Sequence, residues 1–144
     1  MKRNLITILS LVVMSLTLNA TGAYAQSYTK ADVPFAFSVG AKQLPAGTYE
    51  IRVLSQSSNL IKIQNTEATA AALSIARTED PRSTESKLVF DHVGTQYFLT
   101  EICKGFGAGS MVVPISKHEK ELMKELQLAK APADSNQKVI VALK

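Results

Sequence analysis

Cysteine is nearly absent from this sequence of 144 residues, which contains only Cys103. The chain can therefore form no internal disulfide, and its stability must come from packing. Ile102 beside the thiol and the alternating pattern around it favour a buried structural side chain, because buried cysteine behaves as a small hydrophobe. A disulfide between two chains is the open alternative.

Histidine is also scarce, and only His92 and His118 could act as an acid or base near neutral pH. In an alternating strand the neighbours Asp91 and His92 point to opposite faces, so their adjacency does not make a catalytic dyad. Ser83 or Cys103 could act as a nucleophile beside His92, but no nucleophile elbow or comparable motif surrounds either residue. We predict no catalytic residues and expect that the protein is not an enzyme.

Metal ligands lack a recognisable spacing. His92 and His118 lie 26 positions apart and there is one cysteine, which does not fit a zinc site. On a predicted helix, His118 precedes Glu121 and Glu125, a set typical of a solvated face. We predict no metal site and no cofactor.

A glycine-rich segment, Gly-Phe-Gly-Ala-Gly, occupies positions 105–109. A phosphate-binding loop would be followed by a helix, whereas strand-like residues 111–113 follow here, so we interpret the segment as a flexible hairpin loop. Phe106 at its tip is a candidate partner contact, because an aromatic ring on a loop offers a large area for burial. The alternative is that this ring folds back on the core.

Charge of one sign is not concentrated anywhere. Lys2 and Arg3 contribute two of the four net positive charges, which leaves +2 for the rest of the chain. Because the remaining basic residues are mixed with acidic ones, we predict no nucleic-acid partner. Tryptophan is absent and no row of aromatic residues stands out, which lowers the expectation of a carbohydrate-binding module.

The first 25 residues have the features of a signal peptide. A positive end, Met1-Lys2-Arg3, precedes a mostly apolar run at 5–18, and Ala23-Tyr24-Ala25 matches a small-residue cleavage site. A run of this length, at about 1.5 Å per residue, is too short to cross a hydrocarbon core of about 30 Å. We predict an exported protein, periplasmic or extracellular, with no permanent membrane span and a single domain at 26–144.

A period of two dominates the chain after the leader, and turn residues recur about every eight to twelve positions. Residues 33–39 predict the first strand. Because Pro34 cannot donate to a ladder, this strand either starts at a sheet edge or joins the sheet after the proline. Residues 68–77 are ambiguous: their alanines favour helix, but Leu73 and Ile75 fit a strand, which we prefer. The pattern predicts a mainly β fold, an antiparallel β-sandwich or partly open barrel of about seven or eight strands.

The second half contains a predicted hairpin about Gly94, with strands at 87–93 and 95–103, of which the second is central. A polar surface connection at 78–86 precedes it. Ser116 and Glu119 match a capping box and begin a helix at about 116–129, with an apolar stripe formed by Leu122, Met123 and Leu126.

A last strand is predicted at about 138–143, after a linker. Its apolar residues Val139, Val141 and Leu143 are candidate partner contacts. This strand could dock on its own sheet, which we favour, or extend the sheet of a neighbouring molecule.

Four segments carry a resemblance: Val-Pro-Phe-Ala-Phe-Ser-Val-Gly at 33–40, Leu-Pro-Ala-Gly-Thr-Tyr at 44–49, Lys-Leu-Val-Phe at 87–90 and Gln-Tyr-Phe-Leu at 96–99. They resemble a family of small exported β-rich proteins abundant in acidobacterial genomes. The similarity spans roughly residues 32–126 and implies a leader, a β-rich body and a short charged helix, but no activity or site. The element at 44–49 also looks like a turn of transthyretin-like and other secreted β-sandwich modules.

Together these features predict a non-catalytic protein with a binding or assembly role in the cell envelope or outside the cell. Its partners would be a second copy or another envelope protein, met through sheet edges. A carbohydrate- or envelope-polymer-binding module is the alternative, and a hydrolase is the least expected. The pattern leaves open the strand order, the oligomeric state and the identity of any ligand.

Overall fold

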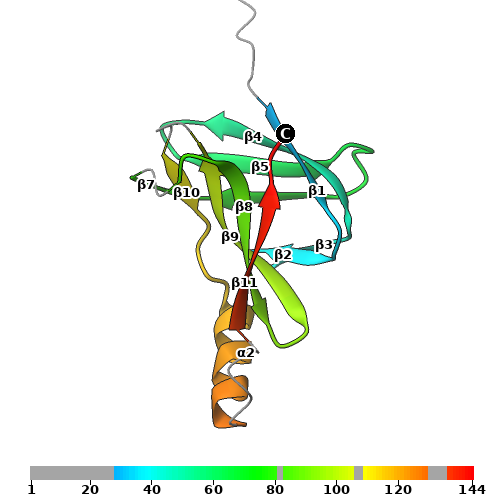
Figure 1. Ribbon diagram of the computed structural model, residues 1–144, viewed down its shortest axis with the longest axis vertical. Coiled ribbons are helices and arrows are strands. Elements are labelled where there is room, and N and C mark those ends of the chain that lie inside the picture. The colour runs from blue at the N-terminus through cyan, green and yellow to red at the C-terminus, as the bar shows by residue number, and fades with distance from the viewer. Residues whose placement is uncertain (1–27, 81–82, 106–108, 130–135) are drawn as a thin grey trace, which may run out of the picture.

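The computed structural model describes residues 28–80, 83–105, 109–129 and 136–144. Within them it contains eleven strands and one helix, arranged as two packed sheets with the helix beyond one end (Figure 1). The mainly β, sandwich-like architecture predicted from the alternation is confirmed, and the two sheets do not close into a barrel. The predicted leader, residues 1–25, lies outside the described residues.

The first sheet, which we call sheet A, has the strand order β1-β4-β5-β6 and is antiparallel throughout. Alternate residues face the second sheet, and Ile51, Ile61 and Ile63 are buried there. The ambiguous segment at 68–77 contains its edge strand. The strands are β1 (Tyr28–Val33), β4 (Gly47–Ser55), β5 (Leu60–Asn65) and β6 (Ala71–Ile75).

The second sheet, sheet B, has the order β11-β8-β9-β10-β7, with β2 and β3 attached beside β9. β9 is therefore a central strand, as its two apolar faces predict. The strands are β2 (Phe37–Val39), β3 (Lys42–Leu44), β7 (Arg77–Glu79), β8 (Ser86–Val93), β9 (Gln96–Lys104), β10 (Ser110–Val112) and β11 (Asn136–Ala142).

Short strands raise the count above the seven or eight expected. Pro34 has no N–H to donate, so the run at 33–39 does not continue as one strand: β1 ends in sheet A and β2 begins in sheet B. Gly40, with a φ of 59°, turns the chain into β3. Residues 77–79 form β7 against β10 and β8 begins at Ser86, so the polar connection predicted over 78–86 is shorter than expected at both ends.

The turn before β4 anchors the core. Leu44 and Tyr49 flank it and are both fully buried. The Tyr49 hydroxyl donates a hydrogen bond to the Pro45 carbonyl at 2.6 Å, so the turn itself satisfies the polar end of this buried ring. The ring packs edge-on against Phe37, with centroids 5.0 Å apart.

The β8–β9 hairpin separates the core from the helix α2 (Lys117–Leu128). Phe90 lies on the core side, 5.2 Å from the ring of Phe35, whereas Phe98 lies on the other side, 6.2 Å from His118 of the helix. The predicted capping box is present, because the Ser116 side chain accepts a hydrogen bond from the Glu119 N–H at 3.1 Å. Among the described residues, no helix is long and apolar enough to span a membrane.

The last strand, β11, pairs with β8 of its own sheet. Beyond it, Leu143 bridges Ala31 of β1, and Lys30 and Lys144 exchange two backbone hydrogen bonds of 3.2 and 2.8 Å. The C-terminus therefore joins the two sheets along one side of the sandwich. On the other side, no described strand pairs β6 with sheet B.

Candidate functional site

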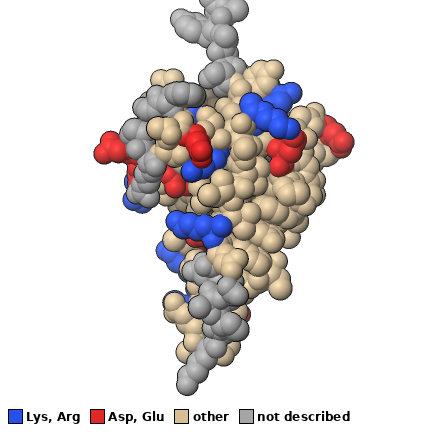
Figure 2. Space-filling model, in the orientation of Figure 1, with Lys and Arg blue, Asp and Glu red and all other residues tan. Residues whose placement is uncertain are grey.

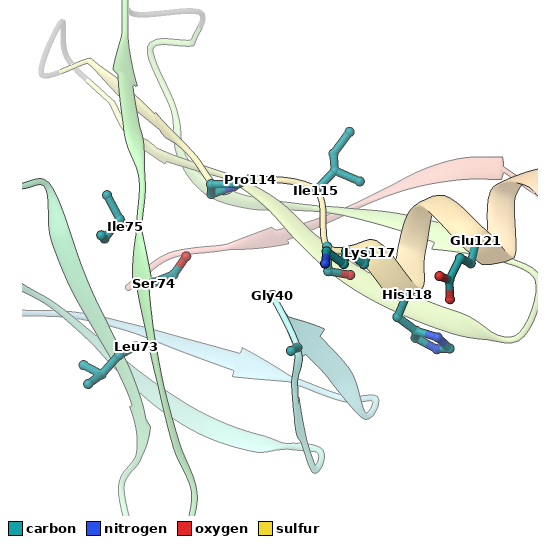
Figure 3. A pocket seen from close by; sticks show the side chains of 11 residues that line it. Gly40, Leu73, Ser74, Ile75, Pro114, Ile115, Lys117, His118 and Glu121 are labelled. Carbon is teal, nitrogen blue, oxygen red and sulfur yellow. The ribbon is translucent and has the colours of Figure 1, made fainter.

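An open groove of about 690 Å³ runs beside β6, and we call it the β6 groove (Figure 3). Residues 73–75 of β6 form one side. Residues 114–118, which lead from β10 into α2, form the opposite side, and Gly40 and Ala41 of the β2–β3 turn lie between the two. The groove therefore occupies the side of the sandwich where the sheets are not joined.

No strand within the described residues pairs with the hydrogen-bonding groups of β6 that face this groove. Asn65 donates its N–H to the Ala70 carbonyl at 2.9 Å, and Ala76 donates to Asn59 at 3.0 Å. Because backbone groups in an antiparallel strand point alternately to either side, residues 70, 72, 74 and 76 bond β5. The N–H and C=O groups of Ala71, Leu73 and Ile75, which we call the edge groups, therefore point away from β5.

The side chains along this edge are apolar on the outer face of sheet A. Leu73 is 61% exposed and Ile75 is 63% exposed, while Ser74 between them points toward the groove (Figure 3). Across the groove, Ile115 is 48% exposed. Single exposed apolar residues are common, but three beside an unpaired strand edge are typical of an interaction surface.

One end of the β6 groove is polar. Lys117, His118 and Glu121 from the start of α2 line it. His118 Nε2 lies 3.1 Å from Gln96 Oε1 and its ring lies against Phe98, so contacts with β9 hold the imidazole in place. The groove thus has an apolar strand edge and a charged end.

Two carboxyl oxygens, one from the first turn of α2 and one from β8, are buried. Glu119 is 3% exposed, and its Oε1 has no hydrogen-bond partner among the described residues. Asp91 Oδ1, on the helix side of β8, is also buried without a partner there. Burial raises the pKa of Glu119, the Ser116 backbone N–H opposes this shift, and the charge of Asp91 adds to it. Burial also raises the pKa of Asp91, although Lys138 on β11 opposes that shift.

The residues considered for catalysis do not come together. His92 stacks on Tyr97 at 4.3 Å, whereas Asp91 lies on the opposite face, as the alternation predicts. Ser83 accepts a hydrogen bond from the Glu85 N–H in its own loop. Cys103 is a buried free thiol whose pKa is raised by burial. No group of three metal-ligating side chains occurs in the part of the chain that the structure describes.

The predicted partner contacts lie elsewhere. Phe106 is outside the described residues. Val139, Val141 and Leu143 are partly buried against the core of their own chain, which leaves less of each side chain for a partner. The alternation at 71–75 predicts a strand but not an edge, so the β6 groove could be found only once the strand order was known.

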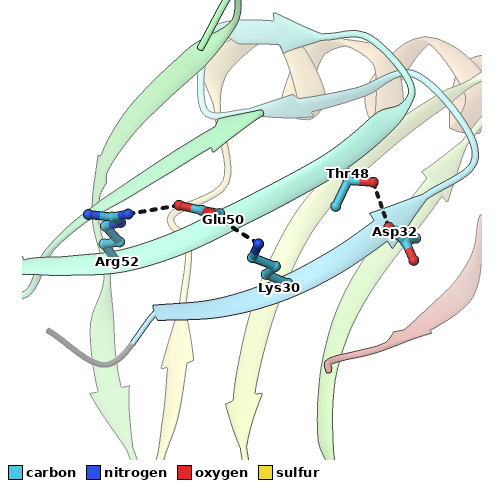
Figure 4. Close-up of polar contacts among 5 residues, drawn as sticks. All are labelled: Lys30, Asp32, Thr48, Glu50 and Arg52. Atoms are coloured by element: carbon cyan, nitrogen blue, oxygen red, sulfur yellow. Dashed lines mark hydrogen bonds and ion pairs between the residues drawn. The ribbon is translucent and has the colours of Figure 1, made fainter. Parts of the chain in front are cut away.

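The opposite edge of sheet A is polar and paired. Glu50 of β4 contacts Lys30 of β1 at 3.4 Å and Arg52 at 2.8 Å (Figure 4). Asp32 accepts hydrogen bonds from Thr48 and Lys144, each at 2.6 Å. On the face drawn in Figure 2, basic and acidic side chains are interspersed rather than gathered into a patch of one sign.

Comparison with known proteins adds no function to this site. No protein-family profile matches the chain, and neither a curated protein nor a solved structure matches it.

Proposed function

We propose that this is an exported, non-catalytic binding protein that takes up an extended segment of another polypeptide along β6. The observation that carries the proposal is the row of edge groups facing the β6 groove. A strand placed there would pair with Ala71, Leu73 and Ile75 and complete an antiparallel ladder that already runs from β1 to β6. Strand addition obtains affinity from backbone hydrogen bonds and specificity from alternate side chains.

The shape of the groove favours one strand over a second copy of the protein. Residues 114–118 face β6 across the groove, so the added element lies between two walls. Neighbouring strands in a sheet lie only about 4.8 Å apart. A single added strand can lie at that distance from β6, whereas a second copy would also have to fit its own sheet beside the groove. A second copy pairing β6 with β6 is the competing outcome of the test below.

The side chains around the edge specify the chemistry of the added strand. Residues level with Leu73 and Ile75 share their outer face, where apolar cross-strand pairs are favourable. The residue level with Ser74 faces the groove, beside Gly40 and Pro114, and is expected to be small. The partner segment is therefore an extended apolar–small–apolar sequence.

The test uses the peptide acetyl-Thr-Val-Ser-Val-Thr-amide, at about millimolar concentration, and amide hydrogen exchange of the full chain without its leader. Binding should slow exchange at Ala71, Leu73 and Ile75. Exchange at Ala72 and Ser74 should not change, because their N–H groups already face β5. Protection at the β1 edge instead, or none at β6, would overturn the proposal, and a dimer that protects β6 without peptide would replace the partner by a second copy.

A matched pair of variants separates strand addition from loss of folding. Leu73→Pro removes an edge N–H without removing a bond to β5, because edge strands tolerate proline where the N–H faces outward. It should weaken peptide binding by more than about tenfold, since a bond is lost and the ring blocks the approach. Leu73→Thr keeps the N–H and should bind within about threefold of the original protein.

A further inference from the structure

The outer face of sheet A is not covered by any described segment. Its inner face packs on sheet B, and α2 lies beyond one end of the molecule (Figure 1). Side chains alternate between the two faces of a strand, and no residue that points outward from β1, β4, β5 or β6 is buried. The outer face is therefore open to a partner across all four strands.

One row of side chains across this face combines an aromatic ring, two cations and an aliphatic group. Tyr28 of β1 is the register partner of Arg52 on β4. Arg52 is in turn opposite Lys62 of β5, and Lys62 is opposite Leu73 of β6. Tyr28 is 51% exposed, and Leu73 and Ile75 on β6 are exposed to 61% and 63%. Apolar surface therefore flanks the cations on both sides.

The cations are not balanced within the outer face. Glu50 contacts Lys30 at 3.4 Å and Arg52 at 2.8 Å (Figure 4). Lys62 makes no ion pair within the described residues, and it lies directly opposite Arg52, where like charges repel. Three cations and one carboxylate leave this part of the face with a net charge of +2.

The positive charge is confined to this part of the molecule. Farther along the same face, Asp32 is already paired with Lys144 at 2.6 Å. The chain after the predicted leader carries +2 in all, so its remaining charges cancel. The outer face of sheet A is therefore the side that an anionic surface would attract.

We propose that the outer face of sheet A lies against an anionic lipid surface, with its basic side chains at the headgroups and the aliphatic side chains of β6 at the acyl boundary. Basic side chains near an anionic bilayer and apolar side chains at its interface both stabilise peripheral binding. A dissolved anion would leave Leu73 and Ile75 in water, so these residues favour a lipid surface over a soluble polymer.

Tyr28 suits the same interface. Its ring centroid lies 5.5 Å from Lys30 Nζ and 5.2 Å from Arg52 Cζ, so two cations flank the ring. A tyrosine side chain has an apolar body and a polar hydroxyl, and such side chains are enriched where a membrane meets water.

Lipid binding does not depend on strand addition. An added strand extends sheet A in its own plane, whereas the lipid surface lies across the face of the sheet. Peptide binding without vesicle binding would refute the lipid surface alone, and vesicle binding without peptide binding would refute strand addition alone.

The experiment is co-sedimentation of the full chain without its leader with vesicles of phosphatidylcholine, either pure or containing about one third phosphatidylglycerol. The protein should bind the anionic vesicles at about 0.1 M salt and bind them less at about 1 M, because salt screens the charges. Equal binding to the pure phosphatidylcholine vesicles, or no binding to the anionic ones, would overturn the proposal.

Lys62→Glu tests the face directly. It reverses one charge and places opposite charges where Lys62 and Arg52 now repel, so the fold should be kept. Vesicle binding should fall by more than about tenfold. Lys124→Glu makes the same change in net charge on an exposed position of α2, and it should bind within about threefold of the original protein. Equal losses in both variants would show that net charge alone matters and would overturn the assignment to this face.

A lipid with a nitroxide on its acyl chain identifies the side that meets the bilayer. NMR signals of the Leu73 and Ile75 methyl groups should broaden more than those of Leu128, which is 84% exposed on α2. Stronger broadening at Leu128 would overturn the proposal. Soluble polyphosphate that binds as tightly as the vesicles, with no broadening at Leu73, would replace the lipid surface by a dissolved anion.

Discussion

The two edges of sheet A are built in opposite ways. At the β1 edge, Glu50 of β4 pairs with Lys30 across the strands and with Arg52 along its own strand, which covers the outer face with charged side chains. The C-terminus closes the backbone there with two hydrogen bonds between Lys30 and Lys144. At the β6 edge, no strand in the described part of the chain pairs with the edge groups, and the outer face carries Leu73 and Ile75.

This difference shows which side of the sandwich is available to a partner. Charged side chains and covering segments protect an edge against pairing with another chain. The β1 edge has both kinds of protection, and the β6 edge has neither along its outer face. The unprotected edge is therefore confined to the β6 side of the sandwich and is not a general property of this small sheet protein.

The largest effect on stability should come from opening the β1 edge, where the C-terminus joins the two sheets. Deleting Leu143 and Lys144 removes three backbone hydrogen bonds and the half-buried Leu143 side chain, a loss of about 3 kcal/mol in the free energy of unfolding. Urea denaturation would measure it. Lys144→Ala keeps the backbone bonds and serves as the control, and equal destabilisation by both changes would show that the charge rather than the backbone closes this side.

A smaller loss is expected at the turn that supports the β1–β4 pair. Tyr49→Phe removes the hydrogen bond to the exposed Pro45 carbonyl, which water can then solvate, so the free energy of unfolding should fall by about 1 kcal/mol. Hydrogen exchange should quicken at the start of β4. If the β6 amides responded more strongly than those of β4, the two edges would not be independent.

Charging the open edge should hardly change stability. Leu73→Lys combined with Ile75→Lys replaces two exposed side chains, so the free energy of unfolding should change by no more than about 0.5 kcal/mol. Peptide binding at β6 should nevertheless be lost, because edge lysines oppose strand pairing. Denaturation and peptide titration of the same sample check both halves, and a large loss of stability would mean that the edge is part of the core.

The smallest effect concerns acid. Hydrogen bonds from Lys144 and Thr48 hold the pKa of Asp32 below its ordinary value of 3.8. The contribution of Asp32 to stability is therefore present above that value and is lost as the pH falls through the lowered one. In the original protein, hydrogen exchange at the Lys30 amide should quicken as the pH falls. In Asp32→Asn, exchange at Lys30 should not quicken further in acid. Exchange at the Leu73 amide, on the other edge, should not change in parallel.

Particular residues show which features of the fold the sequence could predict and which it could not. Alternation predicted the strands around Tyr49 and Phe98, and the spacing of Ser116 and Glu119 predicted the helix start, because these signals depend on neighbours in the chain. The same signals could not show that Arg77 would pair with β10, since that pairing depends on residues more than thirty positions away. They also placed Asp91 and His92 on opposite faces without revealing that Glu119, in a helix of mostly exposed residues, would be buried.

The amino-acid sequence alone determined that this is a mainly β protein with one capped helix and no internal disulfide, because periodicity, capping and composition are local or countable properties. Only the tertiary structure decided which strand is left as an open edge and which carboxyl group, that of Glu119, is buried. Edges and burial depend on the order in which distant strands pair, and a pattern with a period of two is the same for a strand at the edge of a sheet and a strand at its centre.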